Sequence, residues 1–168
     1  MFSAGLLLLV FVPMIFEARR SNRNDRLLRA AGAVEPGGDV YQVMQIAYPC
    51  SFLLPIAEGF VRARPASALA AVGMSVFLVA KALKYWAIGT LGERWTFRVL
   101  VPPHSTRTVQ GPYRWIRHPN YVAVAGEIAG VAMMAQAWIT GALMLIVFTL
   151  LMRARIRVEE SALDFTRG

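Results

Sequence analysis

Five long apolar stretches, separated by polar segments that carry most of the arginines, constrain this chain more than any other feature. Crossing the hydrocarbon core of a bilayer as a helix takes ~20 apolar residues. The chain is 57% hydrophobic with a mean hydropathy of +0.48, above the roughly 45–50% apolar content of soluble domains. We therefore predict an all-α integral membrane protein, a single domain over residues 1–168. Its expected transmembrane helices, about five in number, cover Phe2–Phe16, Val43–Phe60, Ala66–Trp86, Tyr121–Ala137 and Trp138–Met152.

The last two stretches are separated only by the turn at residues 136–138, so we expect them to form a C-terminal helical hairpin. Five crossings place every arginine and lysine except Arg62 and Arg64 on one face. The positive-inside rule makes that face cytoplasmic, with the N-terminus outside and the C-terminus inside. The net charge of +8 then reflects membrane topology, and the sequence does not favour nucleic acid as a partner.

Three polar segments lie outside the expected bundle. Ser21–Asp39 is predicted to be a mobile loop. The amphipathic, proline-broken segment from Leu91 to Arg107 is expected to lie at the cytoplasmic interface. The fifth helix is expected to continue past the membrane over Arg153–Phe165, while Lys81 should extend its ammonium group from a helix end to the interface.

The eleven residues 111–121, with the sequence Gly-Pro-Tyr-Arg-Trp-Ile-Arg-His-Pro-Asn-Tyr, point most directly to function. Pro119 is suited to the first position of the fourth helix, because its missing N–H costs nothing there. His118 would then be the N-cap residue. Capping does not require an imidazole, so we assign a functional role to His118 and Tyr121, whereas Arg114 and Trp115 fit an interfacial belt.

Two further charged features admit two interpretations each. Glu127 lies about 12 Å inside the fourth helix, where an acid costs a few kcal/mol unless it faces a cavity or a partner. It either lines a pocket or takes part in a structural ion pair. Arg155 and Glu159, at i and i+4, form either a weak surface pair or one wall of a binding site.

These residues exclude several kinds of chemistry. The sequence has no Ser/His/Asp set or metal-binding motif, and its lone cysteine, Cys50, has no companion for a disulfide. We predict no metal. Group transfer from an activated cofactor fits better, because it needs positioning and exclusion of water more than a nucleophilic side chain. S-adenosyl-L-methionine is such a cofactor: its amino group requires a carboxylate and its carboxylate requires donors.

The block at residues 111–121, the hairpin after it and the segment from Arg155 to Leu163 resemble the isoprenylcysteine carboxyl methyltransferase family of membrane enzymes. The resemblance covers residues 91–165 and is greatest to a bacterial branch that O-methylates alkylpyrone-type lipids. It implies a multi-pass protein of a bacterial inner membrane, using S-adenosyl-L-methionine at a cytoplasmic pocket. Arg155 would face the acceptor, and Glu159 would hold the polar end of the cofactor. The pocket would be lined by Tyr113, His118, Pro119, Asn120 and Tyr121, and covered by the stretch from His104 to Thr108.

The histidine of that cover lies one residue early in this chain, at His104. Glu127 replaces a position that is usually uncharged in the eukaryotic enzymes, which suits a phenol or enol acceptor whose proton Glu127 would accept. The expected reaction is O-methylation of a carboxylate, phenol or enol on a lipid-like acceptor, such as an alkylpyrone or alkylresorcinol. The alternatives are N-methylation of a phospholipid amine, a non-catalytic membrane protein, and a reductase of the sterol type.

Overall fold

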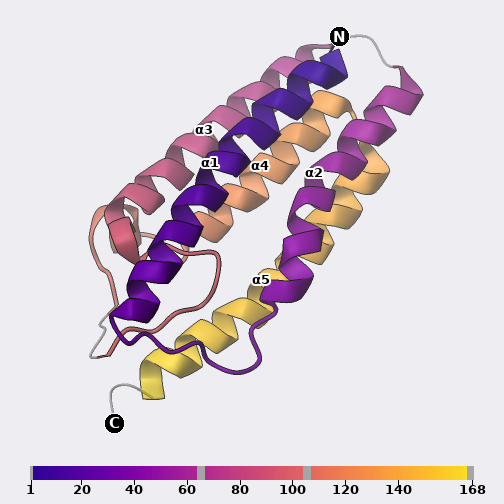
Figure 1. Cartoon of the computed structure of the whole chain (residues 1–168). Coiled ribbons are helices and arrows are strands. Elements are labelled where there is room, and N and C mark those ends of the chain that lie inside the picture. Colours follow the sequence, from indigo (N-terminus) through magenta and orange to yellow (C-terminus); the bar gives the residue numbers. More distant parts are fainter. Residues whose placement is uncertain (1, 64–66, 104–106, 166–168) are drawn as a thin grey trace.

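The computed structural model describes residues 2–63, 67–103 and 107–165 as a bundle of five α-helices (Figure 1). In this described part no β-strand forms, and Val34 and Val101 make only an isolated antiparallel bridge. The all-α prediction is confirmed. The helices are α1 (Phe2–Ala30), α2 (Tyr41–Arg62), α3 (Ala68–Leu91), α4 (Pro119–Ala135) and α5 (Trp138–Phe165), and the connector between α3 and α4 contains two 3-10 turns, η1 (Gly92–Arg94) and η2 (Gly111–Arg114).

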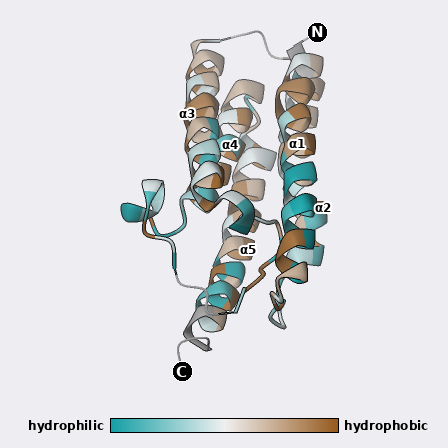
Figure 2. Cartoon of the chain, turned by 60° about the vertical axis from the view of Figure 1, so that its left-hand side comes forward, coloured by the Kyte–Doolittle hydropathy of each residue, from teal (hydrophilic) through white to brown (hydrophobic). Residues whose placement is uncertain are grey.

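Three helical segments in the described residues are long and apolar enough to cross a membrane: Tyr41–Arg62, Ala68–Arg94 and Trp138–Ala162. With 17 residues, α4 is slightly shorter than the ~20 residues that a full span needs. Polar residues gather toward the end of the bundle where α1 and α5 finish (Figure 2). The bundle thus has an apolar half and a polar half, as expected for a membrane protein whose apolar half lies in the bilayer.

The first helix is much longer than its apolar stretch predicted. It continues to Ala30, so the expectation of a mobile loop from Ser21 was wrong for its first ten residues. Glu17, Ser21 and Asn24 follow one another at helical spacing and are all buried. Asn24 Nδ2 donates to the carbonyl oxygens of Gly92 (3.0 Å) and Trp95 (2.8 Å). Contacts with the connector therefore stabilise α1 beyond the end of its apolar stretch.

The helices α3 and α4 approach each other closely through glycines. A Cβ on Gly73 would lie 2.7 Å from the carbonyl oxygen of Gly130, and a Cβ on Gly130 would lie 2.8 Å from that of Gly73. Gly126 precedes Gly130 by one turn and faces Ala80 in the same way. Small residues at this spacing allow backbones in a membrane bundle to pack by van der Waals contact. The contact fixes the position of α4, which carries much of the site.

The tight hairpin between α4 and α5 is confirmed. Gln136 adopts the left-handed conformation with φ 51°, and the N–H of Ala137 donates to the carbonyl oxygen of Ala132 at 2.9 Å. The predicted extension of the fifth helix is also found, because α5 runs to Phe165. The polar ends of α4 and α5 consequently lie side by side, and the connector from η1 folds over the same end of the bundle (Figure 1).

Candidate functional site

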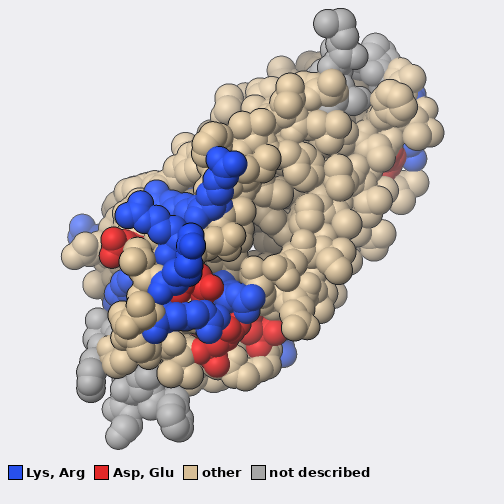
Figure 3. Space-filling view, in the orientation of Figure 1, with Lys and Arg blue, Asp and Glu red and all other residues tan. Residues whose placement is uncertain are grey.

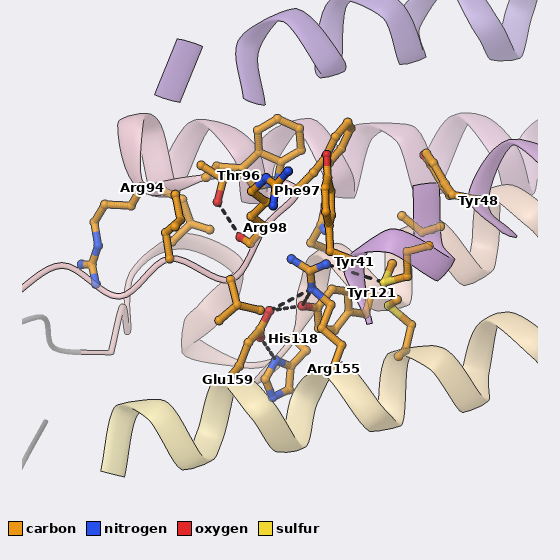
Figure 4. A pocket seen from close by; sticks show the side chains of 18 of the residues that line it. Tyr41, Tyr48, Arg94, Thr96, Phe97, Arg98, His118, Tyr121, Arg155 and Glu159 are labelled. Atoms are coloured by element: carbon orange, nitrogen blue, oxygen red, sulfur yellow. Dashed lines mark hydrogen bonds and ion pairs between the residues drawn. The ribbon is translucent and has the colours of Figure 1, made fainter. Parts of the chain in front are cut away.

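A cavity of about 510 Å³ opens at the polar end of the bundle, between the helices and the connector. That volume is in the range typical of small-molecule sites. Every helix contributes to its wall, and the connector closes one side with Arg94, Thr96, Phe97, Arg98 and Val99. Residues distant in sequence thus surround a single space (Figure 4).

Two of the predicted site residues, Tyr121 on α4 and Glu159 on α5, are hydrogen-bonded across the hairpin, with the phenol donating to Oε1 of the carboxylate. Arg155 Nε donates to the Tyr121 oxygen at 3.0 Å and lies 3.4 Å from the same Glu159 oxygen. The ring of His118 stacks on that of Tyr121 with centroids 5.6 Å apart, and its Nδ1 lies 3.7 Å from Glu159 Oε2. The structure therefore brings these four side chains together (Figure 4).

The local backbone explains how the motif presents these groups. Pro119 is the first residue of α4 and His118 is its N-cap residue, as predicted, but the imidazole makes no capping hydrogen bond. Its ring nitrogens instead face Glu159 and Glu160. Gly111 has φ 54°, and a Cβ there would lie 2.4 Å from Thr90 Oγ1, so only glycine can begin η2 at this position.

Of the other predicted cofactor residues, Tyr113 and Thr108 border the cavity, whereas Pro119 is fully buried and is not one of its lining residues. Tyr113 extends from η2 and is half-buried; burial, and secondarily the nearby Glu159 carboxylate, raises the pKa of its phenol well above the usual range, which keeps the phenol a neutral donor. Thr108 lines the cavity and receives a 3.5 Å contact from Arg94 Nη1. His104 lies outside the described residues.

Asn120 carries an unsatisfied polar atom at the cavity wall. Its Oδ1 is buried, and no donor reaches it among the residues that the structure describes. A buried amide oxygen without a donor costs about 1–3 kcal/mol. Asn120 and Glu159 thus add an amide and a carboxylate to the cavity lining, and both groups fit a ligand that carries an ammonium group or hydroxyl groups.

Arg155 is a buried cation, with 4% of its surface exposed. Besides Tyr121 and Glu159, it faces Asp39, whose Oδ1 lies 3.8 Å from Nη1, and Met44, whose Sδ lies 3.6 Å from Nη1. Asp39 was not predicted as a site residue, because it lies at the end of the segment that was expected to be a mobile loop. Nothing in the local sequence distinguishes it, because the loop between α1 and α2 is brought to the site only by tertiary contacts such as Val99 N–H to Asp39 Oδ2 at 3.2 Å.

Glu127 is not with these groups. It is 1% exposed and pairs with Lys81 Nζ at 2.8 Å and Lys84 Nζ at 3.3 Å. Of the two interpretations left open by the sequence, this geometry favours structural pairing. It also corrects the expectation for Lys81, whose ammonium turns into the bundle toward Glu17 and Glu127 because two buried carboxylates attract it more than the interface does.

The residues assigned to an interfacial belt do lie at the surface. Trp115 is 68% exposed, and its ring lies 5.7 Å from that of Trp86. Arg114 lies beside it, with its guanidinium carbon 6.0 Å from the Trp115 ring. This arrangement agrees with the interfacial interpretation and leaves both residues outside the cavity wall.

Comparison with known proteins gives a consistent result. The model of the isoprenylcysteine carboxyl methyltransferase (ICMT) family matches residues 71–165. The uncharacterized protein YpbQ of Bacillus subtilis (strain 168) is 32% identical over 163 residues, which cover 95% of either chain. An uncharacterized protein of Haemophilus influenzae (strain Rd) is 26% identical over 145 residues, covering 86% of this chain and 84% of the relative. No solved structure matches the chain.

The family match spans more than half of the chain and includes α4, α5 and the motif at residues 111–121. The relative from Bacillus subtilis extends the similarity over α1 and α2 as well. The chain therefore belongs to the isoprenylcysteine carboxyl methyltransferase family of membrane methyltransferases.

Proposed function

We propose that this protein transfers a methyl group from S-adenosyl-L-methionine to an acidic oxygen of a lipid-like acceptor. The observation that carries this proposal is the convergence of Tyr121, Arg155, Glu159 and His118 on one cavity from both ends of the α4–α5 hairpin. Enzymes of the family use this cofactor as methyl donor. When bound, it supplies a methyl group made electrophilic by a sulfonium.

The charges of the cavity wall suit this cofactor. Glu159 is the carboxylate that would hold its ammonium group, and His118 and Tyr121 keep that carboxylate in place from α4. Asn120 Oδ1 would gain the donor that it lacks. Tyr113 and Thr108 would form the surrounding wall, Pro119 would hold its neighbours His118 and Asn120 in place from within the bundle, and His104 is expected to belong to the cover.

On the acceptor side, we assign Arg155 the orientation of the reacting oxygen. Its buried guanidinium would bind and orient the acceptor as an oxyanion, whose charge is lost as the O–CH3 bond forms and the methyl–sulfur bond breaks, and such an interaction is strong where water is excluded. A guanidinium donates hydrogen bonds and accepts none, so it can orient an acceptor oxygen but not the N–H groups of an amine, which supports an oxygen acceptor over the amine of a phospholipid. A phenol or enol acceptor, such as an alkylresorcinol or alkylpyrone, would release its proton to solvent before the transfer, whereas a carboxylate acceptor has no proton to lose.

The acceptor would reach the cavity from the lipid. Met14 and Ala18 of α1 and Pro49 of α2 line the cavity beside Tyr48, and a hollow is visible between α1 and α2 next to the basic end of the molecule (Figure 3). An alkyl chain can occupy such an apolar opening while its polar head lies at Arg155. In this arrangement Glu127 has a structural role between helices and is not required as a base for the acceptor.

Isothermal titration calorimetry of the purified protein in detergent tests the cofactor. Binding of S-adenosyl-L-methionine is expected, and its absence would end the proposal. Incubation with methyl-labelled cofactor and extracted bacterial lipids then separates the acceptors: label in a neutral ether or ester lipid supports O-methylation, whereas label in a phospholipid amine supports the N-methyltransferase alternative.

A further inference from the structure

A second hollow, of about 470 Å³, lies beside α1 where this helix meets the connector. Asn24 and the first two residues of η1 line it together with three arginines of α1, which are Arg19, Arg20 and Arg23. None of these residues lines the large cavity between the helices. The hollow is therefore separate from the site to which we assign methyl transfer.

The three arginines are exposed, and within the part of the chain that the structure describes none of them forms an ion pair. The acids nearest to them in the sequence are engaged elsewhere. Glu17 is paired with Lys81 and Lys84 inside the bundle, and Asp25 is paired with Arg29. Figure 3 shows basic side chains gathered over the polar half of α1. The hollow thus carries positive charge that the rest of α1 does not balance.

The spacing of the arginines makes this charge unfavourable. Arg19 and Arg23 are at i and i+4, and Arg20 and Arg23 are at i and i+3, so like charges are neighbours on the helix surface and destabilise it. Glu93, the one acid among the lining residues, offsets a single charge. The positive-inside rule accounts for basic residues at this end of the helix, but it does not require them to surround one hollow. An anion bound between the guanidinium groups would remove the repulsion.

Two helices place the hollow at the level where acyl chains give way to head groups. On α1 the exposed apolar residues Val12, Ile15 and Phe16 end one turn before the arginines. On α3 the exposed Trp86 lies about 9 Å before Gly92 along the helix, and tryptophan side chains favour the membrane interface. The hollow therefore adjoins an apolar surface that faces lipid and a basic surface that faces water.

A phosphodiester with acyl chains fits this combination. Guanidinium groups bind phosphate oxygens through paired hydrogen bonds, and arginines one turn apart can share one phosphate, since a turn rises only about 5.4 Å. The exposed apolar face beside the hollow distinguishes a lipid from a soluble anion, because acyl chains cover that face and inorganic phosphate does not. Net charge distinguishes anionic phospholipids from zwitterionic ones, whose ammonium group the remaining arginine would repel.

We propose that this hollow binds the head group of an anionic phospholipid. The phosphate lies between Arg19, Arg20 and Arg23, and the acyl chains lie along the apolar face of α1. Because Gly92 and Glu93 border the hollow, the head group also contacts the first turn of the connector. The inference does not depend on methyl transfer, since it concerns a lipid that remains bound to the protein and does not react.

Native mass spectrometry of the purified, delipidated protein in a non-ionic detergent tests the site. Phosphatidylglycerol and phosphatidylcholine with the same acyl chains are added separately, and bound lipid is counted over a range of concentrations. The wild type is expected to bind the first molecule of phosphatidylglycerol at least about tenfold more tightly than phosphatidylcholine. Equal affinity for the two lipids would overturn the inference before any variant is made.

A triple variant removes the basic lining of the hollow: Arg19→Gln, Arg20→Gln and Arg23→Gln. The attraction of an anionic head group is about fivefold for each arginine near the membrane surface, so this lining variant should lose the preference for phosphatidylglycerol. The matched control removes three exposed arginines that lie outside the hollow: Arg26→Gln, Arg153→Gln and Arg157→Gln. It should retain the preference, and equal losses in the two triple variants would indicate diffuse attraction instead of a site.

Thermal unfolding separates a lipid from a soluble anion and checks that the variants fold. A ligand that binds only the folded protein raises its melting temperature. Phosphatidylglycerol should therefore stabilise the wild type and the control variant but not the lining variant. An equal rise with inorganic phosphate alone would replace the lipid by a soluble anion and overturn the assignment. If the lining variant does not fold, Arg20→Gln decides in its place, with an expected loss of affinity of about fivefold.

Discussion

Arg155 and Tyr121, 34 positions apart in the chain, are joined by a 3.0 Å hydrogen bond from the guanidinium Nε to the phenolic oxygen. Both groups also contact the same oxygen of Glu159. A cation, a phenol and a carboxylate therefore share one junction between α4 and α5. Glu159 also contacts His118, whereas Arg155 also contacts Met44 and faces Asp39.

The first prediction concerns Glu159. Its replacement by Gln removes the carboxylate that we assign to the cofactor ammonium, and hydrogen bonds to charged groups contribute about 1.5–3 kcal/mol. Glu159→Gln should weaken binding of S-adenosyl-L-methionine by about tenfold to a hundredfold in calorimetry. Glu160→Gln, on the same helix with an exposed side chain, is the control and should change affinity little. Equal affinity of the two variants would remove Glu159 from the cofactor site.

Arg155→Lys keeps the positive charge but loses the planar donor set that contacts Tyr121 and Glu159. We expect methyl transfer to fall at least about tenfold, with a smaller effect on cofactor affinity, because the guanidinium is assigned to the acceptor. The rate should be measured with labelled cofactor at saturating concentration. Arg157→Lys changes an exposed arginine of the same helix and should retain activity; similar losses in both variants would contradict a specific role for Arg155.

Replacement of glycine by alanine is expected to have opposite effects at two positions of α3, one inside the contact with α4 and one outside it. Gly73→Ala places a methyl group 2.7 Å from backbone atoms of Gly130 and Met134, which should destabilise the fold by about 1–3 kcal/mol. Gly89→Ala, on the same helix with nothing within 4 Å, should stabilise it by roughly 0.5–1 kcal/mol through lower backbone entropy. Thermal unfolding in detergent measures both, and a neutral Gly73→Ala would contradict the close packing.

Asn24 holds the connector to α1 through two carbonyl groups, on Gly92 and Trp95. Asn24→Ala leaves these partners without their donor, at a cost of about 1–3 kcal/mol, and should loosen the segment that closes the cavity. Hydrogen exchange of residues 95–101 should accelerate selectively. Arg23→Ala alters an exposed neighbour and should leave the exchange rate of this segment unchanged. If the two variants exchange this segment at the same rate, Asn24 does not hold the connector.

Glu35 predicts a pH dependence. Its hydrogen bond with Arg29, helped by Arg98 on the connector, lowers the pKa of its carboxyl below the ordinary value of 4.5. A group whose pKa is lowered on folding stabilises the protein above its unfolded pKa, and this contribution is lost as the pH falls through the folded pKa. Thermal stability of the wild type should therefore drop more than that of Glu35→Gln between about pH 5 and about pH 3. If the melting temperatures of the two proteins fall in parallel with pH, the ion pairs of Glu35 contribute nothing to stability.

Much of the fold could be predicted from the sequence because the bilayer imposes lengths and hydropathy that single segments must satisfy. The helices α2, α3, α4 and α5, the hairpin turn at Gln136 and the extension of α5 all follow from local patterns. The site was predicted in part for a similar reason. Tyr121 and Glu159 lie on the two antiparallel helices of one hairpin, toward the polar end of each, so their proximity follows from the turn between the helices.

The residues that sequence reasoning misplaced depend on contacts between segments far apart in the chain. Asn24 and Ser21 are polar and follow the apolar stretch, so nothing local distinguishes a helix from a loop; the helix persists because Asn24 binds the connector 68 and 71 positions later. Asp39 becomes part of the site only when its loop meets Val99 and Arg155.

Sequence alone thus determined the class of fold, the family and the residues that meet across the hairpin, because hydropathy, helix signals and a contiguous motif are local properties. The tertiary structure alone decided what the buried charges do. Glu127 pairs with Lys81 and Lys84, and Lys84 holds Tyr48 at the cavity wall. These partners come from different helices, and the free energy of a buried charge depends on which opposite charges the folded bundle places beside it.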